Sequence, residues 1–291
     1  MAVEQTRVRL VPKPWGRIDL RPWNVYHDAG AAVGEIWFER TDAQVPCPAL
    51  LLKLIFTSAP LSIQVHPDDA YARSIGLVHG KCEAWYVLSA SAGAEIAVGL
   101  KHRLSPAQLR TSIDDGSIAQ QVQWRAVRTG DTTLVSPGTI HAIGAGLVIV
   151  EIQQRSDATF RLFDYGRGRE LHVDAAVAAA SADRAERQVP LRKLTAARTL
   201  LVASPHFVLE RLALPPGSVW KLNAMGEAWL FILAGRAWAG TIDVQTGSTV
   251  FLEADGTRIE VGSDGLDSLV AYTGAVPTPD LLCGLNGGAR A

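Results

Sequence analysis

The chain is poor in cysteine. Its three cysteines, at positions 47, 82 and 283 of 291 residues, are odd in number and far apart in the sequence. A disulfide framework needs cysteines that can pair, and a thiolate zinc site needs cysteines at close spacing. We therefore expect neither of these two kinds of site.

Long apolar runs are also lacking. The best one, HAIGAGLVIVEI from His141, is shorter than a membrane-spanning helix and carries a histidine and a glutamate. The amino-terminal stretch MAVEQTRVRLVPKPWG has charged residues where a signal peptide has its apolar core. These two features predict a soluble, cytoplasmic protein.

Neither sign of charge is in clear excess. The chain has 28 Lys and Arg residues against 29 Asp and Glu residues, a formal net charge of -1, and no run of like charges. Such a chain has no long-range attraction to nucleic acid or to anionic lipid. We expect neither a nucleic-acid nor a membrane partner, while the oligomeric state is not indicated by the sequence.

The residues that are present favour a large β-rich fold. Hydrophobic residues make up 48% of the chain, and most apolar runs are short and broken by Gly, Pro or Asp, which is typical of many short strands. Two segments predict helices instead. In residues 104–118, Ser105 is a cap residue and Pro106 a first-turn proline, and residues 173–188 are rich in alanine.

The alanine-rich segment separates two strand-rich blocks of similar rhythm. The stretch EAWYVLSA at Glu83 is loosely echoed by EAWLFILAG at Glu227. We predict two β-barrels, in residues 1–165 and 198–291, joined by a helical connector in residues 166–197. The second block contains a single histidine, His206, so a metal site built on imidazoles is expected in the first block.

Four polar residues of the first block are candidate metal ligands. Gln64 and His66, in LSIQVHPDDAYA, lie two residues apart and would share one face of a strand. Glu83 follows in KCEAWY, and His141 follows in SPGTIHAIG after a Pro-Gly turn. Two imidazoles, a carboxylate and an amide oxygen suit zinc, with manganese, cobalt, nickel or iron as alternatives. On spacing alone, buried core histidines remain an alternative.

Several motifs of the first block occur together in order: LSIQVHPDDAYA, KCEAWYVL, SPGTIHAIGAG and VEIQQRSDATFRLFDYGR, preceded by KPWG at Lys13 and GEIWFE at Gly34. Together, over residues 10–172, they resemble the type I phosphomannose isomerases. The resemblance implies an all-β fold with helical insertions and two cupin-type (jelly-roll) β-barrels, of which the second has no metal site. It also implies metal-dependent isomerisation of mannose 6-phosphate to fructose 6-phosphate.

The resemblance also assigns roles to individual residues. The family's metal ligands fall on Gln64, His66, Glu83 and His141, with Zn²⁺ as the expected ion. Arg161 matches an arginine that points into the site, and Lys81 matches a lysine assigned to the substrate phosphate. Ser62 shares the strand face of Gln64 and is expected to contact the same phosphate.

The implied reaction moves a proton between C1 and C2 of an open-chain sugar phosphate through an enediolate, which requires a base and nearby positive charge. Glu151 is the preferred base and Asp157 the alternative, with metal-bound water or a ligand histidine as rivals. Arg161 would supply the charge, since a guanidinium stays protonated. A surface ion pair of Arg161 with Asp157 or Asp164, and a solvent-facing Glu151, are the alternatives.

The chain departs from the family pattern beside the glutamate ligand. Cys82 stands where the family often has Thr or Pro, and Gly80 stands where some members place a histidine, which here is His79. Two other functions therefore stay open: isomerisation of another sugar, perhaps an unphosphorylated one, and sugar binding by a cupin without turnover.

Two further groups of residues are given structural roles. Asp68 and Asp69 are expected to cap a helical turn rather than to bind metal. Four tryptophans, Trp15, Trp37, Trp85 and Trp124, are expected to fill the barrels. Trp15 is also expected to border the site.

Overall fold

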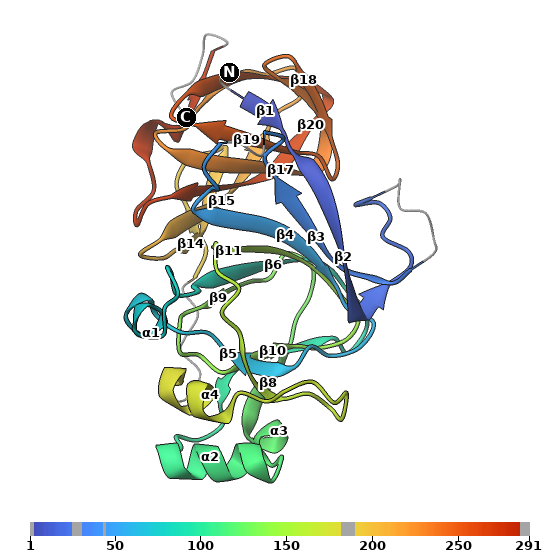
Figure 1. The fold of residues 1–291 in the computed structure, drawn as a ribbon. Helices are drawn as coiled ribbons and strands as arrows, with labels where there is room; N and C mark the ends of the chain where they lie inside the picture. The colour runs from blue at the N-terminus through green and yellow to red at the C-terminus, as the bar shows by residue number, and fades with distance from the viewer. Residues whose placement is uncertain (1–2, 25–30, 43–44, 182–189, 286–291) are drawn as a thin grey trace.

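The computed structural model describes residues 3–24, 31–42, 45–181 and 190–285. Its strands form three sheets, which build two β-rich units stacked one above the other (Figure 1). We call the part from β2 to α4 the first unit, and the part made by β1 and β13 to β21 the second unit. None of the helices in these ranges is long and apolar enough to cross a membrane.

The first unit contains a six-stranded and a five-stranded antiparallel sheet. The six-stranded sheet has the order β2-β3-β4-β11-β6-β9, and the five-stranded sheet has the order β12-β5-β10-β7-β8. The strands of the first sheet are β2 (Arg7–Arg17), β3 (Val33–Glu39), β4 (Leu50–Phe56), β6 (Glu83–Ala90), β9 (Thr132–Val135) and β11 (Leu147–Gln154). Those of the second are β5 (Ile63–Val65), β7 (Glu95–Leu100), β8 (Val122–Ala126), β10 (His141–Ile143) and β12 (Phe160–Phe163).

Four helices belong to the first unit: α1 (Asp69–Ser74), α2 (Pro106–Asp114), α3 (Ile118–Gln121) and α4 (Val173–Ala179). The last three pack through apolar residues on the five-stranded sheet, on the side away from the second unit (Figure 1). Ser105 caps α2, as the sequence predicted, and the structure adds a capping box with Gln108. Asp68 caps α1 by accepting a hydrogen bond from the backbone of Tyr71.

Both predicted helices are shorter in the structure. The helix predicted over residues 104–118 ends at Asp114, because Gly116 adopts a positive φ of 77° and the short α3 starts anew. The alanine-rich helix ends at Ala179, since Ala180 is extended, and residues 182–188 of that prediction lie outside the described ranges. Within the described part of the predicted connector, only α4 is helical.

The second unit is a single ten-stranded antiparallel sheet with a 3₁₀ turn at Pro279–Leu281. β1 (Val3–Gln5) pairs with β19, so the start of the chain joins the second unit. The other strands are β13 (Arg192–Lys193), β14 (Arg198–Ala203), β15 (Phe207–Leu214), β16 (Val219–Asn223), β17 (Glu227–Ala239), β18 (Ile242–Gln245), β19 (Thr249–Glu253), β20 (Gly256–Thr273) and β21 (Leu282–Gly284).

The central strands β4 and β11 of the six-stranded sheet are buried on both faces. In β4, alternate residues such as Leu52 and Leu54 enter an apolar cluster shared with Phe207 and Trp229 of the second unit. The residues between them, including Lys53, face the interior of the first unit. A strand covered on both sides reads as a continuous apolar run, which is the pattern of LLLKLIF.

A carboxylate of the second unit also holds the beginning of β4. Glu227 accepts hydrogen bonds from the backbone N–H groups of Ala49 and Leu50, at 2.5 and 2.9 Å, and from the indole of Trp229. Glu227 is the counterpart of Glu83 in the repeated EAW stretch. In the second unit this carboxylate therefore joins the two units.

Candidate metal centre

Three short elements of the first unit bring His66, Glu83 and His141 together. β10 pairs with β5 so that His141 lies opposite Gln64, and Glu83 is the first residue of β6. The Pro-Gly turn before His141 is present. The backbone N–H of Thr139 donates to the backbone carbonyl of Ser136, and Gly138 has a φ of 84°. The N–H of Gly138 donates to the carbonyl of His66, which ties the two histidine segments together.

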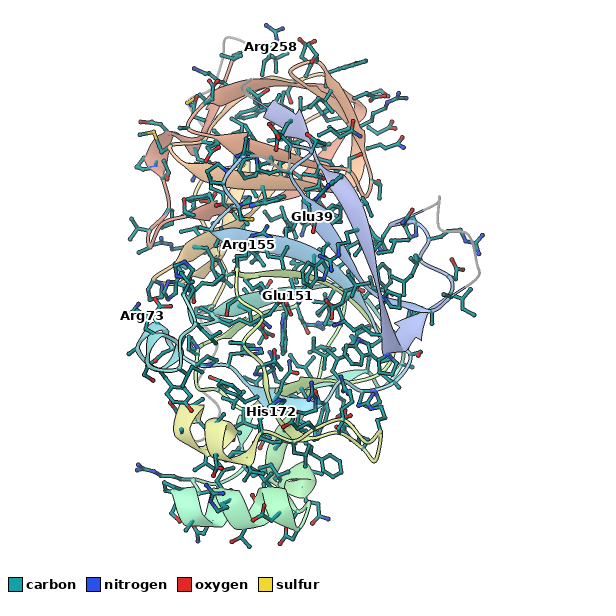
Figure 2. The ribbon with its side chains drawn as sticks, viewed as in Figure 1. Glu39, Arg73, Glu151, Arg155, His172 and Arg258 are labelled. Carbon is teal, nitrogen blue, oxygen red and sulfur yellow. The ribbon has the colours of Figure 1, made fainter. Side chains whose placement is uncertain are left out.

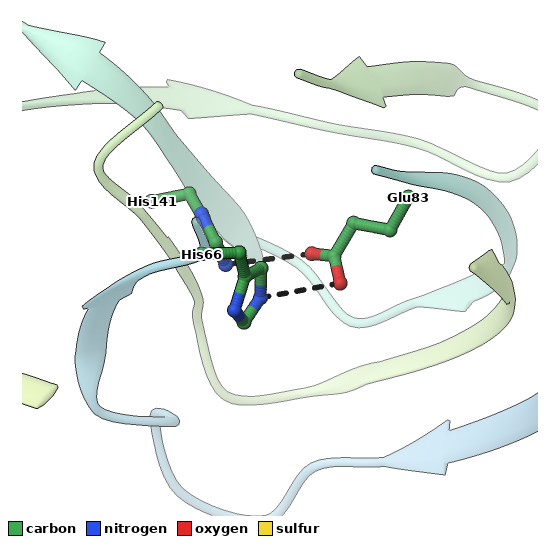
Figure 3. A group of neighbouring side chains, drawn as sticks. All are labelled: His66, Glu83 and His141. Atoms are coloured by element: carbon green, nitrogen blue, oxygen red, sulfur yellow. Dashed lines mark ion pairs between the residues drawn. The ribbon is translucent and has the colours of Figure 1, made fainter. Parts of the chain in front are cut away.

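The three side chains have the geometry of a metal site (Figure 3). Their ligand atoms lie within 4.8 Å of one another. Nε2 of His66 is 3.3 Å from one oxygen of Glu83, and Nε2 of His141 is 3.4 Å from the other. All three residues are fully buried, so water does not screen these contacts.

The hydrogen bonds of the two imidazoles settle which nitrogen carries the proton. Nδ1 of His66 lies 2.8 Å from the carbonyl of Ala158, and Nδ1 of His141 lies 2.9 Å from the carbonyl of Thr139. A carbonyl only accepts, so each Nδ1 is the donor and each Nε2 presents a lone pair. Two lone pairs then face a carboxylate, an arrangement that a cation stabilises.

The electrostatics of these residues favour the same protonation states. Burial lowers the pKa of His66 to about 4, helped by Lys81, so this imidazole is neutral near pH 7. Burial raises the pKa of Glu83, but the charge of Lys81 opposes it, and that pKa lies well below its usual value. Apart from the ion pair with Lys81, neither oxygen of Glu83 has a hydrogen-bond partner among the described residues. The donor set thus fits a divalent ion such as zinc.

Gln64 lies at the edge of this group. Its Nε2 is 3.3 Å from Nε2 of His141, and its Oε1 accepts a hydrogen bond from Ser62. The amide nitrogen therefore faces the histidine in this rotamer. Turning the amide over would present Oε1, the atom expected to bind the ion.

A cavity of about 480 Å³ opens beside the histidines. It is lined by each of the remaining residues for which the sequence suggested a role in catalysis or substrate binding: Ser62, Gln64, Lys81, Glu151, Asp157 and Arg161. Lys81 is buried against the metal centre, with Nζ 2.8 Å from an oxygen of Glu83 and 3.0 Å from Nε2 of His66. Asp157 is exposed at the cavity wall.

Glu151 points into the interior of the first unit and not to solvent (Figure 2). One of its oxygens lies 2.8 Å from Nζ of Lys53, and the other accepts a hydrogen bond from the indole of Trp85. These residues occupy one row across β6, β11 and β4, where Trp85 is opposite Glu151 and Glu151 is opposite Lys53. Cross-strand pairing thus holds the carboxylate in place.

Arg161 lies opposite Gln64 in the pairing of β12 with β5. Its guanidinium donates to the carbonyl of Glu170, and its Nε has no hydrogen-bond partner within the described ranges. Burial lowers the pKa of Arg161, yet a guanidinium remains charged at working pH. Asp164, suggested as its surface partner, instead pairs with Arg167 and Arg169.

Lys13, Glu35 and Lys53 are among the charged residues of the cavity that the sequence reasoning missed. Glu35 lies 3.3 Å from Lys13 and 3.7 Å from Lys53, and accepts a short hydrogen bond from the indole of Trp37. The available signal was a charged residue inside a mostly apolar strand, namely Glu35 in GEIWFE and Lys53 in LLLKLIF. A buried charge needs a partner of opposite charge, and each of these two strands supplies the partner for the other.

No protein-family profile matches this chain. Among curated proteins, mannose-6-phosphate isomerase from Streptococcus mutans is 36% identical over 195 residues, which is 64% of this chain and 61% of that protein. Mannose-6-phosphate isomerase from Bacillus subtilis is 37% identical over 139 residues, covering 44% of this chain and 42% of that protein. The matched regions thus span roughly half of these relatives.

Solved structures match over nearly the whole chain. The mannose 6-phosphate isomerase of Bacillus subtilis has a TM-score of 0.80 at 24% identity, with 93% of this chain and 99% of that chain covered. A variant of phosphomannose isomerase from Salmonella typhimurium has a TM-score of 0.73 at 12% identity, with 94% and 100% covered. These similarities confirm the predicted fold class and the resemblance to the phosphomannose isomerases.

Proposed function

We propose that this chain is a metal-dependent aldose-ketose isomerase that interconverts mannose 6-phosphate and fructose 6-phosphate through an enediolate. The observation that carries the proposal is the convergence of two imidazole Nε2 atoms and an ionised carboxylate beside a cavity rich in cations. The names of its sequence relatives support the same reaction.

The residues around the cavity fit the demands of proton transfer. Zn²⁺ or a similar ion held by His66, Glu83, His141 and the oxygen of Gln64 would stabilise negative charge on the sugar oxygens. Glu151 is proposed to carry the proton between C1 and C2, since Lys53 and Trp85 hold its carboxylate at the cavity wall. Asp157 is the alternative carrier, exposed on another part of that wall.

Positive charge completes the proposed mechanism. Arg161 reaches the cavity from the strand beside Gln64 and is placed to stabilise the enediolate. Lys81 and Ser62 also line the cavity. The family resemblance assigns Lys81 to the substrate, and Ser62 is a candidate because it shares the strand face of Gln64. The substrate would be a free sugar phosphate of the cytoplasm, with no nucleic-acid or membrane partner.

The test is a coupled assay on protein stripped of metal and then reloaded with zinc, manganese or cobalt. Fructose 6-phosphate formation from mannose 6-phosphate is expected only in the reloaded samples. Tight sugar-phosphate binding without turnover by any reloaded sample would instead indicate a binding protein. Turnover of free mannose at an equal rate would contradict the phosphorylated substrate.

A further inference from the structure

A second group of charged side chains surrounds Trp15, at the part of the cavity built by β2. Nζ of Lys13 lies 5.7 Å from the centre of the indole ring, and the guanidinium carbon of Arg169 lies 5.0 Å from it. The guanidinium carbon of Arg167 is 5.9 Å away. The loop between β12 and α4 thus reaches across to β2 and brings its arginines to this indole.

The indole of Trp15 is itself an unused donor. Trp15 is 5% exposed and lines the cavity, and its Nε1 has no hydrogen-bond partner in the described part of the chain. A buried N–H that is left unpaired has lost its hydrogen bonds to water without gaining any from the protein. Such a group in a cavity wall indicates an acceptor that a ligand supplies.

The surrounding backbone leaves room for this arrangement. A Cβ atom added to Gly34 would lie 2.4 Å from Cβ of Lys13 and 3.2 Å from Nε1 of Trp15. Any larger residue would therefore displace Lys13 and crowd the indole N–H. This contact explains why the KPWG and GEIWFE stretches belong together, since the glycine of one accommodates the lysine and tryptophan of the other.

The charges at this end favour an anion. Three cations, Lys13, Arg167 and Arg169, are partnered by two carboxylates, those of Glu35 and Asp164. Glu35 is shared further with Lys53. The group therefore has positive charge in excess, and it combines this charge with a buried neutral donor, which is a suitable environment for phosphate oxygens.

We propose that the phosphate of the substrate is bound by Nε1 of Trp15 together with Lys13 and Arg169. This inference rests on the proposed function, because C1 and C2 must lie at the metal centre and the phosphate is at the opposite end of the carbon chain. Lys81 and Ser62 contact Glu83 and Gln64, and so lie at the metal end. Lys81 and Ser62 therefore act near the reacting carbons of the sugar. The group around Trp15 sets the preference for a phosphorylated sugar.

The experiment titrates sorbitol 6-phosphate and sorbitol into the zinc-loaded protein by calorimetry, since neither compound has a carbonyl to turn over. Trp15→Phe, which keeps an aromatic ring but removes the N–H, and Arg169→Ala should each weaken sorbitol 6-phosphate binding about tenfold or more. In the coupled assay both should raise KM for mannose 6-phosphate by a similar factor, with kcat and zinc content nearly unchanged.

The matched control is Arg7→Ala, which removes the same charge from an exposed position of β2 outside the cavity and should leave binding unchanged. The inference would be overturned if Trp15→Phe bound sorbitol 6-phosphate as tightly as the wild type does. It would also be overturned if Arg7→Ala lost as much affinity as the Trp15 and Arg169 variants. A loss confined to Lys81→Ala would overturn it as well. If the Trp15 and Arg169 variants lose binding while the wild type turns over no sugar phosphate, the phosphate site stands and the proposed reaction fails.

Discussion

Lys53 and Glu151 face each other across neighbouring strands, with Nζ of the lysine 2.8 Å from an oxygen of the glutamate and both side chains almost fully buried. Burial lowers the pKa of Lys53, but the carboxylates of Glu151 and Glu35 outweigh it and raise that pKa above its usual value. The pair places a carboxylate in the cavity wall, where the proposed reaction needs a proton carrier.

Replacing Lys53 by methionine should therefore lower the free energy of unfolding substantially. Glu35 and Glu151 would be left buried with their closest shared cation removed, and breaking a buried ion pair in this way costs about 3–5 kcal/mol of unfolding free energy. Denaturant unfolding would measure this loss. The double variant Lys53→Met with Glu151→Gln should recover part of it, because one uncompensated charge is gone, and a simple sum of the two single losses would contradict the coupling.

Glu35 should make the stability depend on acid pH. Burial raises the pKa of Glu35, but Lys53 and Lys13 outweigh it and lower that pKa to about 2, against 4.5 for an unperturbed glutamate. Its contribution of about 3 kcal/mol is then present above pH 4.5 and is lost as the pH falls towards 2. Urea unfolding from pH 5 to pH 3 should show a shallower decline for Glu35→Gln than for the wild type. Parallel declines would contradict this role.

Metal removal should destabilise the first unit. Zinc binding only to the folded state adds about 4 kcal/mol at a free concentration a thousand times Kd, so chelation should lower the melting temperature by several degrees. His141→Ala should abolish this response to zinc. His206→Ala, which removes a histidine of the second unit, is the matched control and should respond as the wild type does. A zinc response retained by His141→Ala would place the ion elsewhere.

Arg161→Ala should affect turnover much more than metal content. Within the described residues, the guanidinium of Arg161 contacts neither histidine of the metal centre. Its proposed role is to stabilise the charge that develops in the transition state. Removing such a group lowers kcat about 100-fold or more. Coupled kinetics and atomic absorption measure the two quantities on the same sample. An equal loss of zinc would show that Arg161 supports the metal centre instead.

Local patterns in the sequence predicted several features that the structure confirms. Alternation along 61–65 and the Pro-Gly turn before His141 are properties of neighbouring residues, and they oriented Gln64 and His141 correctly towards one interior. The helix caps at Asp68 and Ser105 are likewise short-range, because each side chain bonds a backbone group three residues along the chain. The lengths of the helices were less well predicted, since their ends depend on the backbone conformations of Gly116 and Ala180.

By itself, the sequence determined the strand-rich character of the chain, the first block as the place of the candidate metal ligands, and the residue types available to hold an ion. Only the tertiary structure decided which partners those residues have. Lys53 meets Glu151, Arg169 meets Trp15, and Glu227 caps the start of β4 from the second unit. The reason is physical: side-chain direction along a strand follows from local geometry, whereas these contacts depend on strand register and sheet packing between segments far apart in the chain.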